Sequence, residues 1–289
     1  MWLIENDLPF LPGEAHENLP ARKRARLQII TKWLDSPDQA INYRKACVLK
    51  SSCLLTGSWF LEGEKFNIWK RQLGSWLWLH GIPGCGKTVL NSTIVQTLLS
   101  EFGSSPHHAV IYFYFDFRDQ KVSASDMLRS FIQQLCDKDG ESAQALDFLY
   151  TSNCREGARA PTEEELLATF HQILGHFKQT FLLIDALDEC KERTQLLNDI
   201  VEMAQWKLAG FSVLMTSRRE NDIFESLEEI AQEDFRIEIQ EKDVNGDIQI
   251  WLQDQLRTGR LNKKFRKWTR PDMIMEAIEA NLMEQASGM

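Results

Sequence analysis

The sequence predicts an α/β fold in which helices cover both faces of a mostly parallel, five-stranded sheet. Short, nearly continuous apolar runs, typical of strands buried on both faces, alternate with longer amphipathic segments of helical spacing. The 289 residues, 43% hydrophobic and 26% charged, suffice for one large domain with a sizeable core. We therefore expect a three-layer α/β/α arrangement, preceded by a helical segment and followed by the start of a helical domain.

The N-terminal part precedes the predicted sheet. Residues 1–20 contain three prolines and are expected to form an irregular leader, and they lack the basic start of a signal peptide. Residues 21–50 carry apolar side chains at helical spacing and are predicted to be helical, with an interruption at Pro37. We assign residues 1–54 to this leader and helical segment.

The predicted sheet and its covering helices lie within residues 55–240. The predicted strands are 75–80, 108–117, 180–185, 211–217 and, with a weaker alternating pattern, 234–240. The helices predicted between them are 87–102, 123–137, 163–177 and 193–207. A further helical pattern begins at residue 243, so residues 241–289 are expected to be the truncated beginning of a helical domain.

Charge and cysteine content argue against several classes of protein. The formal net charge of −9 argues against broad binding of nucleic acids or anionic membranes, which needs a basic field. We interpret the basic cluster at 22–26 as a solvated helix face. None of the six cysteines forms a CxxC pair, which favours reduced thiols over a zinc or thioredoxin-like site. Since no apolar run approaches the roughly 20 residues of a membrane span, we expect a cytoplasmic protein.

The strongest motif is a phosphate-binding loop between the strand at 75–80 and the helix at 87–102. It matches GxxxxGK[ST] at every position: Gly81, Ile82, Pro83, Gly84, Cys85, Gly86, Lys87 and Thr88. Glycines let successive N–H groups converge on one anion, and the next helix presents its positive end there. Lys87 can reach the β- and γ-phosphates, and the Thr88 hydroxyl can ligate Mg²⁺. The sequence therefore predicts a P-loop NTPase fold, with nucleotide contacts extending to Val89.

Three acids follow the predicted strand 180–185. Asp185, Asp188 and Glu189 end an otherwise apolar run, either because a buried strand returns to water or because the acids serve a cation. If this strand ends near the first, Asp185 reaches the Mg²⁺ held by Thr88, and the other two acids extend over the γ-phosphate. We predict Thr88 and Asp185 as metal-binding residues, and Glu189 and Asp188 as catalytic candidates.

Two arginines follow the predicted strand 211–217. If this strand lies between the other two, the residues after it sit beside the phosphate loop. A guanidinium there can distinguish a triphosphate from a diphosphate, because its paired donors fit phosphate oxygens. We choose Arg218 for this role and assign Arg219 to the surface, although the two could be exchanged.

Together these motifs resemble the NACHT family of signal-transducing NTPases in the STAND group, and more narrowly its fungal members with a nephrocystin-type N-terminal NTPase module. The matching segments are LWLHGIPGCGKTVL, FYFDFRD, LLIDALDEC, LMTSRRE and, before the phosphate loop, TGSWFLEGEKFNIWK. The resemblance covers about Ala40 to Met289. It implies a switch that is closed with ADP and assembled with ATP, as a homo-oligomer, between an effector and a repeat sensor.

The resemblance also implies roles for single residues. Glu189 is the acid that activates water, and Arg218 is the sensor of the terminal phosphate. Thr56 and Gly57, in the segment before the phosphate loop, border the adenine. The segment FDFRD brings Asp116 or Arg118 near the catalytic centre, or else it is a solubility patch at the end of a strand.

The leading functional hypothesis is an ATP- and ADP-binding switch with slow Mg²⁺-dependent hydrolysis, within an NLR-like receptor of immunity or incompatibility. The alternative is a nucleotide-stabilised interaction module without turnover, and Glu189 favours hydrolysis over this alternative. A P-loop metabolic kinase is disfavoured, because the sequence contains no convincing arginine-rich lid. The choice of ATP over GTP follows from the resemblance, since no NKxD motif is present.

Overall fold

The structure, a computed structural model, describes residues 21–50, 57–118, 122–140, 142–153, 159–240, 244–249 and 277–281. The predicted leader 1–20, Thr56 and most of the predicted helical tail lie outside these residues.

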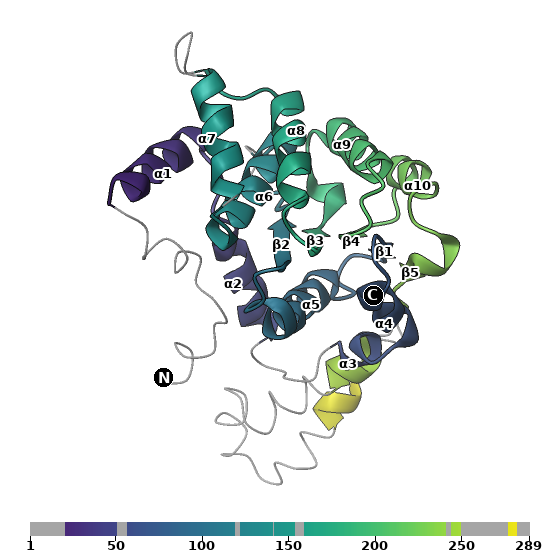
Figure 1. Cartoon of the computed structure of the whole chain (residues 1–289). Helices are drawn as coiled ribbons and strands as arrows, with labels where there is room; N and C mark the ends of the chain where they lie inside the picture. The colour runs from purple at the N-terminus through teal and green to yellow at the C-terminus, as the bar shows by residue number, and fades with distance from the viewer. Residues whose placement is uncertain are drawn as a thin grey trace, which may run out of the picture.

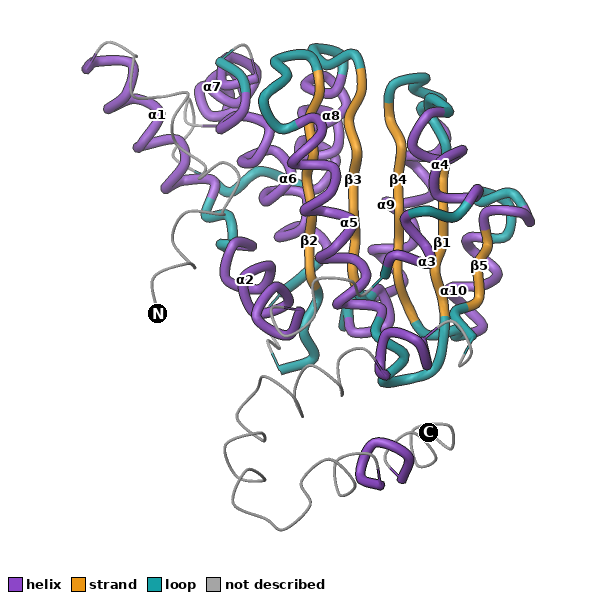
Figure 2. The backbone as a smooth tube through the Cα atoms, turned by 90° about the horizontal axis from the view of Figure 1, so that it is seen from below, coloured by secondary structure: helices purple, strands orange, loops and turns teal. Residues whose placement is uncertain are grey.

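A five-stranded sheet forms the centre of the molecule. Its strands are β1 (Trp76–His80), β2 (His108–Tyr114), β3 (Gln179–Asp185), β4 (Phe211–Ser217) and β5 (Arg236–Glu238). They are arranged in the order β2-β3-β4-β1-β5, and each pair of neighbours is parallel (Figure 2). The predicted α/β sheet is therefore confirmed, and β4 does lie between β1 and β3. Because parallel strands end at the same edge, the segments after these three strands are brought together.

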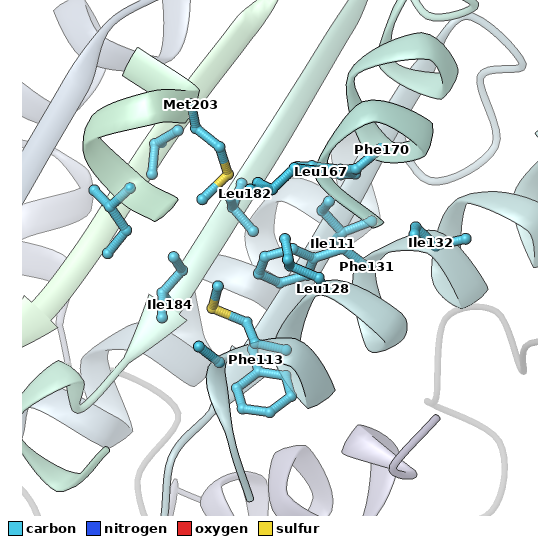
Figure 3. Close-up of a cluster of buried hydrophobic side chains, with 14 of the residues drawn as sticks. Ile111, Phe113, Leu128, Phe131, Ile132, Leu167, Phe170, Leu182, Ile184 and Met203 are labelled. Atoms are coloured by element: carbon cyan, nitrogen blue, oxygen red, sulfur yellow. The ribbon is translucent and has the colours of Figure 1, made fainter. Parts of the chain in front are cut away.

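Five helices lie on one side of the sheet: α6 (Ala124–Lys138), α7 (Ser142–Asn153), α8 (Glu163–Leu174), α9 (Arg193–Gln205) and α10 (Asn221–Leu227) (Figure 1). The helix α1 (Ala21–Leu34) packs against α7 at the edge of this layer. Capping boxes at Ser123 and Thr162 fix the starts of α6 and α8. Figure 3 shows how Phe113 of β2, Phe131 of α6 and Phe170 of α8 meet in this core, all three fully buried.

Four helices cover the opposite face. They are α2 (Gln39–Lys50), α3 (Ser58–Leu61), α4 (Glu64–Arg71) and α5 (Lys87–Phe102). Trp69 of α4 is fully buried, and its Nε1 donates to the carbonyls of Ser75 at 3.2 Å and Val213 at 3.0 Å. This side chain ties α4 to the beginnings of β1 and β4. The start of β1 is thereby held against its neighbour, at the edge of the sheet opposite the phosphate loop.

The outer edge of β2 is covered by side chains. Gln134 of α6 accepts from the Tyr112 N–H at 3.1 Å and donates to the Tyr112 carbonyl at 2.9 Å. Gln39, at the start of α2, accepts from the Tyr114 N–H at 2.9 Å. Unpaired groups on an edge strand invite pairing with another chain, so these two glutamines satisfy groups that would otherwise be open. The predicted N-terminal helical segment thus completes one edge of the sheet.

Several predicted boundaries differ from the structure. The strand predicted at 108–117 ends at Tyr114, because the Asp116 carboxylate accepts from the Arg118 N–H at 3.0 Å and turns the chain. The strand predicted at 234–240 is limited to Arg236–Glu238, since a 3-10 turn precedes it. The helices α3, α4, α7 and α10 were not predicted. α7 is only weakly amphipathic, and α10 is too short for a clear periodic pattern.

Two further observations concern membrane-spanning helices and disulfides. None of the helices in the described part of the chain combines the length and the apolar character needed to cross a membrane. Among the same residues, Cys47, Cys85, Cys136 and Cys190 are not joined in disulfides.

Candidate functional site

The phosphate loop joins β1 to α5 at the carboxyl edge of the sheet. Gly84 and Gly86 have left-handed backbones, with φ of 84° and 83°, and Gly86 is the N-cap of α5. Only glycine adopts this conformation without strain. The Lys87 ammonium lies across the loop, where it donates to the carbonyls of Gly81 at 2.7 Å and Ile82 at 2.9 Å. The loop therefore curves around a positive charge.

The first turn of α5 adds amide donors beside this charge. The N–H groups of Lys87, Thr88 and Val89 have no acceptor within the helix, because the first turn of an α-helix leaves them free. The helix dipole adds a partial positive charge at the same end. Such an arrangement of amides and lysine is suited to binding the phosphates of a nucleotide.

Asp185, the last residue of β3, is the centre of the polar network next to the loop. Its carboxylate accepts from the Thr88 hydroxyl at 2.7 Å, the Thr216 hydroxyl at 2.6 Å and the Asn91 amide at 3.3 Å. Burial raises the pKa of Asp185, while these three donors and the charge of Lys87 act in the opposite direction. The structure thus brings the two predicted metal-binding residues, Thr88 and Asp185, into direct contact.

This network fits a Mg²⁺ ion that the protein shares with phosphate oxygens. Asn91 is fully buried, and its Oδ1 has no hydrogen-bond partner although its Nδ2 donates to Asp185. No group of three or more His, Cys, Asp or Glu in the described part of the chain is arranged to hold a metal. Mg²⁺ usually takes one or two carboxylates together with substrate phosphates and water. The oxygens of Thr88 and Asp185 suit such a shared site.

The chain turns sharply after Asp185. Ala186 has a left-handed backbone, with φ of 59°, and its N–H donates to the Thr216 hydroxyl at 3.0 Å. Non-glycine residues are uncommon in this conformation, and they cluster at functional sites. The turn leads into a 3-10 helix, Leu187–Glu189, which directs the two remaining acids back over the sheet edge. Thr216 therefore holds both the carboxylate of Asp185 and the turn that follows it.

Glu189 is held by the loop that follows β2. Its Oε2 accepts from the Phe117 N–H at 2.9 Å. Burial raises the pKa of Glu189, the Phe117 amide lowers it, and the charges of Asp188, Asp116 and Asp185 raise it further. A raised pKa brings a carboxylate closer to the range in which it can accept a proton from water. The geometry and the pKa direction are both compatible with the predicted role of this acid.

Asp188 is engaged with Arg218. Its carboxylate accepts from the Arg218 backbone N–H at 2.9 Å and lies 3.1 Å from the Arg218 Nε. The neighbouring Arg219 points elsewhere, with its guanidinium 4.6 Å from the centre of the Phe224 ring on α10. Of the two arginines after β4, Arg218 is the one held beside the acids.

A cavity of about 320 Å³ lies beside the phosphate loop, on the side of β5. Its lining includes Ile82, Pro83 and Cys85 of the loop, Ile239 after β5, and Asn245 and Ile248 of the short helix at 244–249. A mostly apolar cavity with a few polar groups suits a nucleobase and ribose. A larger cavity, of about 630 Å³, lies where α1 and α2 meet α6, and no predicted site residue lines it.

Gly57 contacts the short helix at 244–249. It does not line the 320 Å³ cavity, and its N–H donates to the Asp247 carboxylate at 2.7 Å. Trp59 packs against Phe60, with 5.6 Å between the centres of the two rings. Thr56, the other residue predicted to border the adenine, lies outside the described residues.

Sequence reasoning missed two polar residues near the site. Asn91 lies three positions after Thr88, and a polar residue on that face of an otherwise apolar helix was the available signal. Asp247 meets Gly57 across 190 positions of sequence, and no local pattern indicates that contact. Asp116 and Arg118, whose role was left open, pair with each other at 2.6 Å.

Comparisons with known proteins were consistent with this geometry. The family described as nephrocystin 3, N-terminal, matches residues 55–218. The vegetative incompatibility protein HET-E-1 of Podospora anserina is 25% identical over 273 residues, covering 88% of this chain and 19% of that protein. The chain thus spans about a fifth of the length of this relative.

Two solved structures were found as distant matches to this chain. The Aeropyrum pernix ORC1 protein in complex with DNA has a TM-score of 0.40 and 16% identity, over 85% of this chain and 51% of that chain. Drosophila ORC bound to DNA has a TM-score of 0.33 and 17% identity, over 79% and 52% of the two chains. These likenesses are too distant to indicate a function.

Proposed function

This chain belongs to the nephrocystin 3 N-terminal family, and we propose that it is an ATP- and ADP-binding switch of the NACHT type that hydrolyses ATP slowly with Mg²⁺. The observation that carries this proposal is the contact between the Thr88 hydroxyl and the Asp185 carboxylate at 2.7 Å. It joins the first turn after a phosphate loop to a buried acid at the end of another strand. A metal bound to nucleotide phosphates needs oxygen ligands at such a place.

In the proposed nucleotide complex, the phosphates contact the loop and the nucleoside enters the adjacent cavity. Lys87 and the amides of the first turn of α5 bind the β- and γ-phosphates. Thr88 and Asp185 provide oxygens for Mg²⁺, which when bound neutralises charge on the phosphates. The base and ribose occupy the cavity between the loop and the helix at 244–249.

In the proposed hydrolysis, Glu189 and Arg218 have different tasks. Glu189 orients the attacking water and accepts its proton, a role supported by its position one turn after Asp185 and by its raised pKa. Arg218 contacts the terminal phosphate and stabilises the charge that spreads over its oxygens. Asp188 serves by holding Arg218 in place, as their two contacts support.

We further propose that the module is part of a cytoplasmic, NLR-like receptor of incompatibility or immunity, which assembles as a homo-oligomer in the ATP state. The similarity to HET-E-1 supports this context, since that protein is named for vegetative incompatibility and is several times longer than the matched region. The lack of disulfides among the cysteines of the described residues is in keeping with a reducing compartment.

The test combines calorimetry with an assay of phosphate release. ADP, ATP and GTP are titrated into the full chain with and without Mg²⁺, and phosphate is followed under excess Mg²⁺-ATP. We expect binding of ADP and Mg²⁺-ATP, weaker binding of GTP, and slow release of phosphate. Absence of binding to any nucleotide would overturn the proposal. Binding without phosphate release would favour the interaction module instead.

A further inference from the structure

A hydrogen bond to a carboxylate joins the segment before the phosphate loop to the helical segment after the sheet. The Asp247 carboxylate accepts from the Gly57 N–H at 2.7 Å, across 190 positions of sequence. In Figure 1 the helix that carries Asp247, residues 244–249, is drawn in light green next to α3. Gly57 is the N-cap of α3, so the bond connects two short helices that the chain separates by the whole sheet.

The Gly57 side of this bond is tightly fixed. Gly57 has a left-handed backbone, with φ of 89°, and a Cβ at this position would stand 2.8 Å from Leu90 Cδ1. Leu90 is buried in the second half of the first turn of α5, two residues after Thr88. Only glycine fits a left-handed backbone this close to α5 without displacing the leucine. The amide that Asp247 binds therefore lies close to the helix that follows the phosphate loop.

The Asp247 side of the bond borders the proposed nucleoside cavity. Val244, Asn245 and Ile248, from the same short helix, line this cavity opposite residues of the phosphate loop. Val244 also packs against the core between the sheet and α3–α5. Besides this apolar contact of Val244, the hydrogen bond between Asp247 and Gly57 links the helix to the NTPase core. One wall of the cavity thus depends on a contact made outside the cavity.

The environment of Asp247 shows that the contact is partly desolvated. Burial raises the pKa of its carboxyl, whereas the Gly57 amide and a hydrogen bond from the Trp59 side chain lower it. A hydrogen bond to a charged acceptor is about twice as strong as one between neutral groups. Loss of either partner would leave a buried polar group unsatisfied.

We propose that the Asp247–Gly57 contact is a latch that holds the helix at 244–249 as a wall of the nucleoside cavity and thereby limits nucleotide release. The proposal rests on the proposed function, because it assigns the regulation of that same site. Asp247 is neither a phosphate-loop residue nor one of the metal-binding pair, and it acts as a positioning residue. Opening of the latch frees the base and ribose while leaving the phosphate contacts intact.

The test measures dissociation of a fluorescent ADP analogue, labelled on the ribose, from the full chain by stopped flow. Asp247→Ala removes the acceptor and is expected to accelerate dissociation about tenfold, from the loss of the charge-assisted hydrogen bonds that Asp247 accepts. Asp247→Asn retains a neutral acceptor and is expected to accelerate it only about threefold. Asp234→Asn, at an exposed position of the turn before β5, is the matched control and should leave the rate unchanged.

A second ligand separates the latch from the phosphate site. Tripolyphosphate lacks a nucleoside, so its affinity by calorimetry should be the same for the wild type and Asp247→Ala. Equal dissociation rates of the ADP analogue from wild type and Asp247→Ala would overturn the latch, as would an equal weakening of analogue and tripolyphosphate. If the wild type bound neither ligand, the proposed nucleotide site itself would fail.

Discussion

Asp188 holds Arg218 at two points, through its backbone N–H at 2.9 Å and its Nε at 3.1 Å. The carboxylate comes from the turn after β3 and the arginine from the end of β4, so the contact exists only because these strands are neighbours. The Asp188 side chain is 7% exposed and that of Arg218 is 48% exposed. A nearly buried acid therefore positions a guanidinium whose free face remains accessible to a ligand.

Replacing Arg218 with Ala should weaken ATP more than ADP. The proposed contact is to the terminal phosphate, which ADP lacks, so the differential loss should be about 1–3 kcal/mol. Calorimetry with both nucleotides measures it. Arg219→Ala removes the same charge from a side chain that lies over Phe224, and it should affect both nucleotides little. Equal losses of ATP and ADP affinity in the Arg218 variant would place the sensor elsewhere.

Replacing Asp188 with Asn should reproduce part of the Arg218 effect. The amide can still accept from the Arg218 backbone N–H, but it loses the charge opposite the guanidinium. We expect the preference for ATP over ADP to fall by about 1 kcal/mol, by the same titrations. If Asp188 instead activated water, the phosphate-release rate would collapse while the preference between the two nucleotides stayed as in the wild type.

Replacing Lys87 with Ala should abolish measurable binding of both nucleotides. The Lys87 ammonium is the charge around which the loop curves, and it contributes no apolar packing to the core. The melting temperature of the nucleotide-free protein should change little. Lys65→Ala, at an exposed position of α4, makes the same change in net charge and should retain binding. Unchanged ADP affinity in the Lys87 variant would contradict the phosphate-loop assignment.

Replacing Glu189 with Gln should separate binding from hydrolysis. The amide oxygen can still accept from the Phe117 N–H, so the loop should keep its geometry, but the side chain can no longer take a proton from water. We expect Mg²⁺-ATP to bind as in the wild type and phosphate release to slow about 10²–10⁴-fold. The exposed Glu192→Gln serves as the control in the same assay. An unchanged rate would show that another group activates the water.

The stability of the fold should depend on pH through Asp199 of α9. This side chain is 1% exposed, and burial and the neighbouring acids Glu163 and Glu202 raise its pKa to about 7, against a hydrogen bond from Gln195. A pKa raised on folding means that the folded state holds the proton more tightly than the unfolded state. The stability that the folded state gains by binding this proton is therefore fully present below about pH 4, and it is lost as the pH rises towards 7.

Urea unfolding of the wild type and Asp199→Asn across this pH range measures the effect. The wild type should lose about 2 kcal/mol relative to the variant between about pH 5 and pH 7, because the variant has no proton to release. If the free energy of unfolding changed with pH in the same way for both proteins, the pH dependence would come from groups other than Asp199.

Much of the fold was predictable because it depends on local patterns. The continuous apolar run of β3 and the phosphate loop between β1 and α5 each report on burial and backbone geometry within one short segment. Elements without such a signal were missed. α7 buries small and scattered apolar residues, and the turn at Asp116 that shortens β2 depends on a side-chain hydrogen bond to Arg118.

The residue types of the candidate site were determined by the sequence, whereas their partners were decided by the tertiary structure. Glycines, Lys87 and Thr88 follow from the chemistry of phosphate binding, and they are adjacent in the chain. Which of Arg218 and Arg219 lies beside the acids depends on their contacts with Asp188 and Phe224, which lie on other elements. The hydrogen bond between Gly57 and Asp247 forms only because the chain, after the last strand, comes back to the segment that precedes the sheet. A local sequence pattern shows which face of a segment is buried. It does not show which distant side chain contacts that face, because this depends on how the layers of the fold pack together.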